Sequence, residues 1–186
     1  MSSTGIYFVR HGETAANRSF RFSGAIDLPL NKRGSIQASN CYPTISQLDF
    51  SAIYCSPLQR ARQTASIATG GRLNRPPIII DNRLVERSFG TIDGKFAPFA
   101  MRKVWDYDSS FIKSHYGEET LLTLELRVED FLNMVRQQHS DQNILVFSHG
   151  GVATTINAIL NENHVRSGYF FKHFHMKNGD IAYFAL

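Results

Sequence analysis

Three short runs of apolar residues most constrain how this chain folds. They occupy residues 6–9, 52–55 and 144–147. A run of this length without polar alternation is typical of a strand buried on both faces, as in a parallel sheet. Helical patterns fill the segments between and after these runs, at 32–46, 58–69, 121–138 and 152–160. Strands that alternate with helices predict an α/β fold.

The C-terminal part of the chain predicts one more strand. Asn178-Gly179 separates the segments 170–175 and 181–184, and this dipeptide between two such segments is a hairpin signal. We therefore expect a hairpin there, which adds an antiparallel strand at the edge of the sheet.

The length predicts a single domain that spans residues 1–186. A chain of 186 residues with 42% hydrophobic content can bury one core but is short for two. The segment at about 87–117 is rich in aromatic residues and has no regular period, apart from one helix expected near 98–106. Aromatic residues in such a segment more often pack than bind. Because a long loop in a compact domain often covers an active site, we also interpret this segment as a substrate-covering insertion.

Charge and cysteine content narrow the class of partner and the compartment. The net charge is +4, and no basic stripe is interleaved with aromatic residues, so we expect a small anion as partner and no nucleic acid. Cys41 and Cys55 lie in apolar surroundings without metal or redox spacing, which indicates reduced core thiols and a cytoplasmic protein. No export signal and no apolar run of about 18 residues is visible, so we expect no membrane contact.

Histidine and arginine residues follow the ends of the predicted strands. Arg10 and His11 come directly after the first apolar run, and His149 comes directly after the third. Arg60 lies in the first turn of the helix that follows the second run. Ligands of α/β sheets bind beyond the carboxyl ends of the strands, so we expect these side chains to lie together.

Two histidines with neighbouring arginines suit a phosphoryl group. Planar guanidinium groups bind its oxygens, while a neutral imidazole attacks phosphorus, and nearby positive charge lowers the pKa of that imidazole. Helices beginning after Gly12 and Gly150 are expected to direct their N-termini at the anion. Each residue taken alone is more often structural. The competing interpretation is a zinc site in which Glu13 or Asp27 joins His11 and His149, although adjacent arginines repel a cation.

Four sequence blocks resemble the histidine phosphatase superfamily, the phosphoglycerate mutase-like enzymes. They are RHGETAANRSFRFSGAIDLPLNKRG, CSPLQRARQTA, LVERSFGTIDG and FSHGG, and they extend over nearly the whole chain. The resemblance implies a three-layer α/β/α sandwich with a mostly parallel central sheet, helices on both faces and an antiparallel edge strand. It also implies phosphoryl transfer that needs no metal ion and no other cofactor.

The same resemblance implies a role for each site residue. His11 is the nucleophile, and Glu86 donates a proton to the leaving group and then activates water. The phosphoryl oxygens are held by Arg10, Arg60 and His149. Substrate binding is implied for Asn17, Ser23, Gly24 and Gly150. Glu13 is expected to support the pocket, and Arg62, two residues beyond Arg60 on the helix, to face elsewhere.

The resemblance leaves the phosphoryl acceptor open between water and a second hydroxyl. The stretch after Glu86 is short, Phe89 stands where a mutase has tyrosine, and 117–120 (GEET) resembles the element that opens the long helix of phosphatases. We therefore expect a phosphatase acting on a small phosphorylated metabolite. A phosphoglycerate mutase remains the alternative because Arg102, Lys103 and Lys113 could bind a second acidic group. A non-catalytic binding module is the third hypothesis, and a homodimer is left open.

Overall fold

One five-stranded sheet forms the centre of the molecule. The computed structural model describes residues 5–70, 76–96, 113–161 and 174–186. Within these ranges the strand order is β3-β2-β4-β1-β5. The strands are β1 (Gly5–Arg10), β2 (Ala52–Cys55), β3 (Ile78–Ile80), β4 (Asn143–Ser148) and β5 (Ile181–Ala185). Neighbouring strands are parallel except β1 and β5. The predicted α/β class with an antiparallel edge strand is confirmed.

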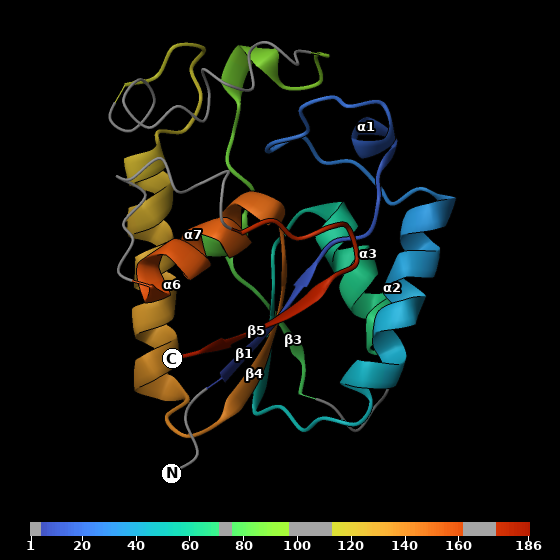
Figure 1. Ribbon diagram of the computed structural model, residues 1–186, viewed down its shortest axis with the longest axis vertical. Helices are drawn as coiled ribbons and strands as arrows, with labels where there is room; N and C mark the ends of the chain where they lie inside the picture. Colours follow the sequence, from blue (N-terminus) through green and yellow to red (C-terminus); the bar gives the residue numbers. More distant parts are fainter. Residues whose placement is uncertain (1–4, 71–75, 97–112, 162–173) are drawn as a thin grey trace.

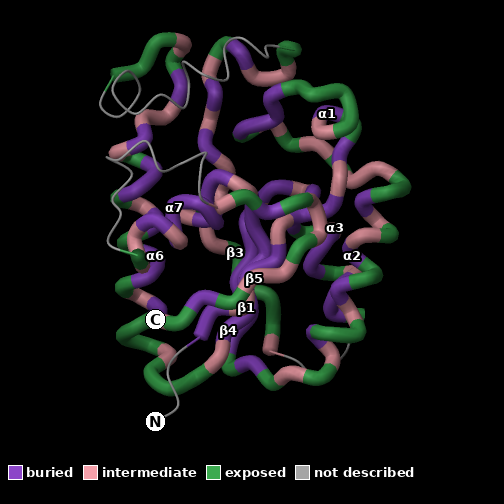
Figure 2. The backbone as a smooth tube through the Cα atoms, in the orientation of Figure 1, coloured by how far each residue is buried: buried purple, intermediate pink, exposed green. Residues whose placement is uncertain are grey.

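Helices cover both faces of this sheet (Figure 1). The helices α2 (Lys32–Ile45) and α3 (Gln59–Ala68) lie on one face, and α6 (Leu121–Gln138) and α7 (Gly150–Leu160) lie on the other. Alternate residues of a strand point to opposite faces. Accordingly, Ile6 and Phe8 belong to the core under α6 and α7, whereas Val9 belongs to the core under α2 and α3. Figure 2 shows the central strands buried and the outer helix faces exposed.

The predicted elements agree closely with the observed ones. The three buried strands and the helices α2, α3 and α6 begin and end within one or two residues of their expected bounds, and α7 begins two residues before its expected start. The structure adds β3, a short helix α1 (Ala15–Arg18) and two 3-10 turns, η1 (Asn82–Leu84) and η2 (Gly90–Ile92).

The strand β5 forms, but within the described ranges its partner strand is β1 and not the segment 170–175 of the predicted C-terminal hairpin. This strand pairs antiparallel with β1, in a register that joins Gly5 to Ala185 and Val9 to Ile181. Residues 174–177 form no strand, and residues 170–173 lie outside the described ranges. The turn at Asn178-Gly179 therefore directs the chain onto β1, where backbone hydrogen bonding and burial of Phe184 stabilise it.

The described part of the insertion packs against the N-terminal loop, and both thiols are buried. Phe89 and Ile92 pack with Phe22 into a small separate core, which agrees with the packing interpretation for this part of the insertion. The helix expected near 98–106 lies outside the described residues. Cys41 and Cys55 are buried free thiols, as predicted. No helix in the part of the chain that the structure describes is long and apolar enough to span a bilayer.

Candidate active site

The carboxyl ends of β1, β2 and β4 bring the predicted imidazole and guanidinium groups together. In the parallel ladder Arg10 pairs with Ser148, so His11 and His149 each follow a paired residue. Their rings lie 5.0 Å apart between centroids. The helix α3 begins at Gln59, which places Arg60 in its first turn.

Arg60 is fully buried and holds both imidazoles. Its Nε–H donates to His11 Nε2 and to His149 Nδ1, at 3.3 Å each. Arginine has no acceptor, so both of these ring nitrogens must be unprotonated. The remaining nitrogens agree: His11 Nδ1–H donates to the Gly12 carbonyl at 2.7 Å, and His149 Nε2–H donates to Ser56 Oγ at 2.8 Å. The site thus presents His11 as a neutral imidazole whose unprotonated Nε2 accepts a hydrogen bond from Arg60.

Burial and charge keep both rings neutral. Desolvation lowers the pKa of His11 well below its ordinary value, and the positive charges of Arg60 and Arg10 lower it further. The pKa of His149 is lowered well below the ordinary value for the same reasons, burial first and Arg60 second. A nucleophilic imidazole must be unprotonated, so this environment suits the expected role of His11.

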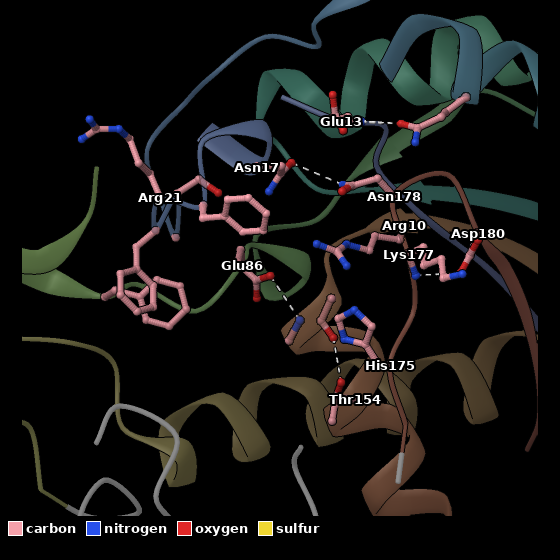
Figure 3. Close-up of a pocket in the computed structure, with 18 of the residues that line it drawn as sticks. Arg10, Glu13, Asn17, Arg21, Glu86, Thr154, His175, Lys177, Asn178 and Asp180 are labelled. Atoms are coloured by element: carbon pink, nitrogen blue, oxygen red, sulfur yellow. Dashed lines mark hydrogen bonds between the residues drawn. The ribbon is translucent and has the colours of Figure 1, made fainter. Parts of the chain in front are cut away.

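The carboxyl group of Glu86 is fixed at the start of α7. Its Oε1 accepts from the Arg87 backbone N–H at 2.9 Å, and its Oε2 accepts from the Gly151 N–H at 3.1 Å. Figure 3 shows the second of these bonds and the carboxyl group at the edge of the pocket. Both oxygens are therefore oriented by backbone donors, next to the cavity where a leaving group would lie.

Arg10 lies between Glu86 and the C-terminal segment. Its Nη1 donates to the Met176 carbonyl, while its Nε is buried without a hydrogen-bond partner within the described residues. Burial lowers the pKa of Arg10, and the carboxylates of Glu86 and Asp180 oppose that shift. A Cβ atom on Gly150 would lie 3.3 Å from the guanidinium carbon, so glycine at that position leaves room for Arg10.

The helix termini differ from expectation on one side of the site. α7 begins at Gly150, two residues before its expected start, and its N-terminus lies directly after His149. On the other side no helix begins directly after Gly12: α1 begins at Ala15, capped by Thr14, and has only four residues. We therefore correct the expectation of two helix dipoles to one, because a single short turn sums few peptide dipoles.

The predicted substrate-binding residues line one cavity of about 660 Å³. Arg10, Asn17, Ser23, Gly24, Glu86 and Gly150 all contribute to its wall. His11, Arg60 and His149 are buried beside it, and Arg60 Nη2 connects the two groups by donating to the Gly24 carbonyl at 2.7 Å. The structure thus brings every predicted site residue into one region.

The carboxylates considered as zinc ligands are engaged elsewhere. Glu13 Oε1 accepts from Asn31 Nδ2 at 2.9 Å, as expected of a supporting residue, and Asp27 Oδ1 accepts from the Gln59 N–H at 2.5 Å. Among the described residues, no group of three or more His, Cys, Asp or Glu side chains could hold a metal ion. Arg62 is exposed, which agrees with its omission from the site.

Comparison with known proteins identifies the family. The sequence profile of the histidine phosphatase superfamily (branch 1) matches residues 6–184. The chain belongs to the histidine phosphatase superfamily. An adenosylcobalamin/alpha-ribazole phosphatase from Escherichia coli is 32% identical over 83% of this chain and 78% of that protein. Phosphoserine phosphatase 1 from Hydrogenobacter thermophilus is 31% identical over 77% and 70%.

Solved structures agree with this assignment. The alpha-ribazole phosphatase from Shigella flexneri superposes with a TM-score of 0.82 at 30% identity, over 96% of this chain and 89% of that one. The predicted resemblance to histidine phosphatases is confirmed, and the names of these relatives agree with a hydrolase of the phosphatase type.

Two glycines of this histidine phosphatase explain why its first block extends so far past His11. A Cβ atom on Gly12 would lie 2.3 Å from the Gly34 carbonyl oxygen, and one on Gly34 would lie 2.2 Å from the Glu13 oxygen. Contacts this close exclude any side chain. The block therefore includes the close backbone contact of Gly12 and Glu13 with Gly34, as well as the residues of the site.

Three supporting residues were not predicted. Ser56 accepts from His149, Thr64 Oγ1 accepts from the Gly12 N–H at 3.1 Å, and Asn178 Nδ2 donates to the His11 carbonyl at 3.0 Å. Ser56 and Thr64 lie inside the second block, and only their nearness to Arg60 in the sequence could have indicated a role at the site. Asn178 signalled only a turn.

Proposed function

We propose that this protein is a phosphomonoester hydrolase that needs no metal ion and passes the phosphoryl group of a small phosphorylated metabolite through His11. The observation that carries this proposal is the protonation pattern around Arg60. It leaves His11 Nε2 unprotonated, with its electron pair held only by a 3.3 Å hydrogen bond from Arg60, in a site that also contains Arg10 and the fixed carboxyl group of Glu86.

In the first step His11 Nε2 attacks phosphorus and the P–O bond of the ester breaks. Arg10, Arg60 and His149 hold the phosphoryl oxygens, and the carboxyl group of Glu86 gives its proton to the leaving oxygen. The hydrogen bond from Arg60 to Nε2, at 3.3 Å, gives way as the N–P bond forms. Asn17, Ser23, Gly24 and Gly150 border the substrate.

In the second step water replaces the histidine. The Glu86 carboxylate takes a proton from water as its oxygen bonds to phosphorus, and Nε2 leaves with the electron pair of the N–P bond. Glu86 is then protonated again, and inorganic phosphate is the product. One carboxyl group thus serves as acid and then as base.

The alternatives are separated by the acceptor and by turnover. A mutase returns the phosphoryl group to a second hydroxyl. Three basic residues favoured this alternative. Arg102 and Lys103 lie outside the described residues, and Lys113 is exposed. A binding module would keep the pocket without turnover. The buried free thiols support a reducing compartment, and we place the protein in the cytoplasm.

The test follows phosphate release and the covalent intermediate. Wild-type protein is expected to hydrolyse p-nitrophenyl phosphate in EDTA, and His11→Ala is expected to be inactive. Quenching with alkaline detergent after exposure to a substrate labelled in its phosphoryl group should leave label on His11 that is stable in base and lost in acid. His139→Gln is the control, because His139 ends α6 and contacts Ser51 and Tyr54 rather than the site, and this variant should retain activity.

Three results would overturn the proposal. Activity that EDTA removes and zinc restores would contradict the metal-free mechanism. Interconversion of 2- and 3-phosphoglycerate faster than phosphate release would identify a mutase. Binding of phosphate esters with no label on His11 and no product would indicate a binding module.

A further inference from the structure

The side chain of Phe20 faces solvent at the cavity. It is 82% exposed and lines the cavity beside the catalytic groups. Its backbone φ of 53° belongs to the turn that ends α1, in which the Phe20 N–H donates to the Asn17 carbonyl and the Arg21 N–H donates to the Ala16 carbonyl. This turn explains the backbone of Phe20 but requires no aromatic side chain. With most of its surface in water, the ring gains little from packing in the free protein, whereas a ligand in the cavity would give it a contact.

Three further phenylalanines line the same cavity. Phe22 and Phe89 do so with their ring centroids 4.8 Å apart, and Phe174 does so from the C-terminal segment. Glu86, which is to protonate the leaving oxygen, also lines this cavity, and Phe89 follows it by three residues. A leaving group that takes the proton of Glu86 therefore lies in the same cavity as these rings.

We propose that the substrate is a phosphate ester whose alcohol carries a planar aromatic ring, and that Phe20 binds this ring. The proposal rests on the proposed function and names its substrate class. Aromatic rings attract one another in offset or edge-to-face arrangements beyond the effect of area alone. A small polar alcohol such as serine would leave Phe20 in water. A cavity of about 660 Å³ has room for a ring beside the phosphoryl group.

The test compares two esters of primary alcohols on a series of Phe20 variants. Benzyl phosphate has the ring, and O-phosphoserine lacks it. Wild-type protein should have the higher kcat/KM with benzyl phosphate. Phe20→Ala and Phe20→Gly should each lower this value by about fivefold to tenfold and leave the value for O-phosphoserine within about twofold. Phe20→Tyr, which keeps the ring, should match wild type.

Other outcomes contradict the proposal in distinguishable ways. Equal losses on both esters, or no loss on benzyl phosphate, would show that the ring does not select the substrate. A difference between the Gly and Ala variants on both esters would assign Phe20 a backbone role instead. If wild type hydrolyses neither of these esters nor p-nitrophenyl phosphate, the proposed function fails. Affinity for benzylphosphonate against ethylphosphonate then still tests the ring contact, and equal affinities would overturn it.

Discussion

A single side chain, Arg60, joins His11, His149 and the loop that contains Gly24 and Ile26. Its Nε–H is shared by His11 and His149, and its Nη1 and Nη2 donate to the carbonyls of Ile26 and Gly24, at 2.7 Å each. Burial lowers its pKa, while the carboxylates of Glu86, Asp27 and Asp93 oppose that shift. A planar fork of donors suits this set of acceptors, and an ammonium group does not.

We therefore predict that Arg60→Lys lowers kcat/KM by about 100-fold, the effect of losing one preorganised donor. The free energy of unfolding should also fall by about 1–3 kcal/mol, because at least one buried carbonyl loses its donor. Arg62→Lys, two residues away and exposed, is the matched control and should change neither quantity. Phosphate-release kinetics and urea denaturation measure both effects. Equal behaviour of the two variants would contradict this assignment.

The two buried histidines make the folded state sensitive to acid. Burial and Arg60 hold the pKa of His11 and that of His149 well below 6.5 in the folded protein. The unfolded chain has ordinary histidine pKa values, so below pH 6.5 it binds protons that the folded state does not. Stability is therefore complete above pH 6.5 and falls as the pH drops toward the folded pKa values. Each histidine contributes a slope of up to about 1.4 kcal/mol per pH unit.

We predict that His11→Gln removes one such slope. Urea denaturation of wild type and variant from pH 7.5 to pH 5 should give curves that converge on acidification, since the variant lacks one acid-sensitive group. His115→Gln, on an exposed residue, serves as the control and should run parallel to wild type. If the His11 variant also runs parallel to wild type, His11 is not held neutral by the fold.

At the scale of elements, the start of α3 depends on a residue from a distant loop. Leu58 occupies the N-cap position and has no side chain that caps the helix. Asp27 substitutes for it by accepting from the Gln59 N–H. Because the first turn of α3 carries Arg60, this contact also positions the site.

We predict that Asp27→Ala lowers the free energy of unfolding by about 1 kcal/mol, the usual value of a lost N-cap. Asp27→Asn should retain most of the stability because the amide oxygen still accepts. Asp49→Ala, on an exposed aspartate, controls for the loss of a surface charge. Chemical denaturation of the variants provides the measurement, and an unchanged midpoint for Asp27→Ala would show that water caps the helix equally well.

The elements differ in how clearly their sequences mark them. β1, β2 and β4 were predictable because each is a continuous apolar run buried on both faces. β3 was missed, since this three-residue edge strand has exposed side chains and no burial pattern. The predicted partner strand of β5 was wrong because a hairpin signal reports only neighbouring residues, whereas the observed pairing with β1 joins opposite ends of the chain.

At the scale of the whole molecule, the site assembles where the topology brings distant strand ends together. His11, Arg60 and His149 were predictable because each follows a strand end within a family block. Asn178 and Phe20 were not, because their roles depend on where the loops fold back over the sheet. The positions of the buried imidazole and guanidinium groups follow from the chain order of strands and helices, whereas the lining of the cavity follows from tertiary structure.

The two thiols report on the integrity of the core between the sheet and the helices α2 and α3. Cys41 and Cys55 belong to this one core. Burial raises the pKa of Cys41 to about 11 and that of Cys55 to about 12. Only a thiolate reacts with a disulfide reagent, so both should be inert in the native state at pH 8.

We predict that a disulfide reagent modifies Cys41 and Cys55 at one common rate. This rate should equal the rate of global unfolding when modification is faster than refolding, and should be proportional to the unfolded population when it is slower. Mass spectrometry of digested samples follows each cysteine separately, and low urea concentrations should accelerate both in parallel. The reason is that α2, which carries Cys41, and β2, which carries Cys55, contribute to the same apolar core, so we expect the two to open together. Modification of Cys41 alone under native conditions would show instead that α2 opens independently, and that the close backbone contact of Gly12 and Glu13 with Gly34 opens with it.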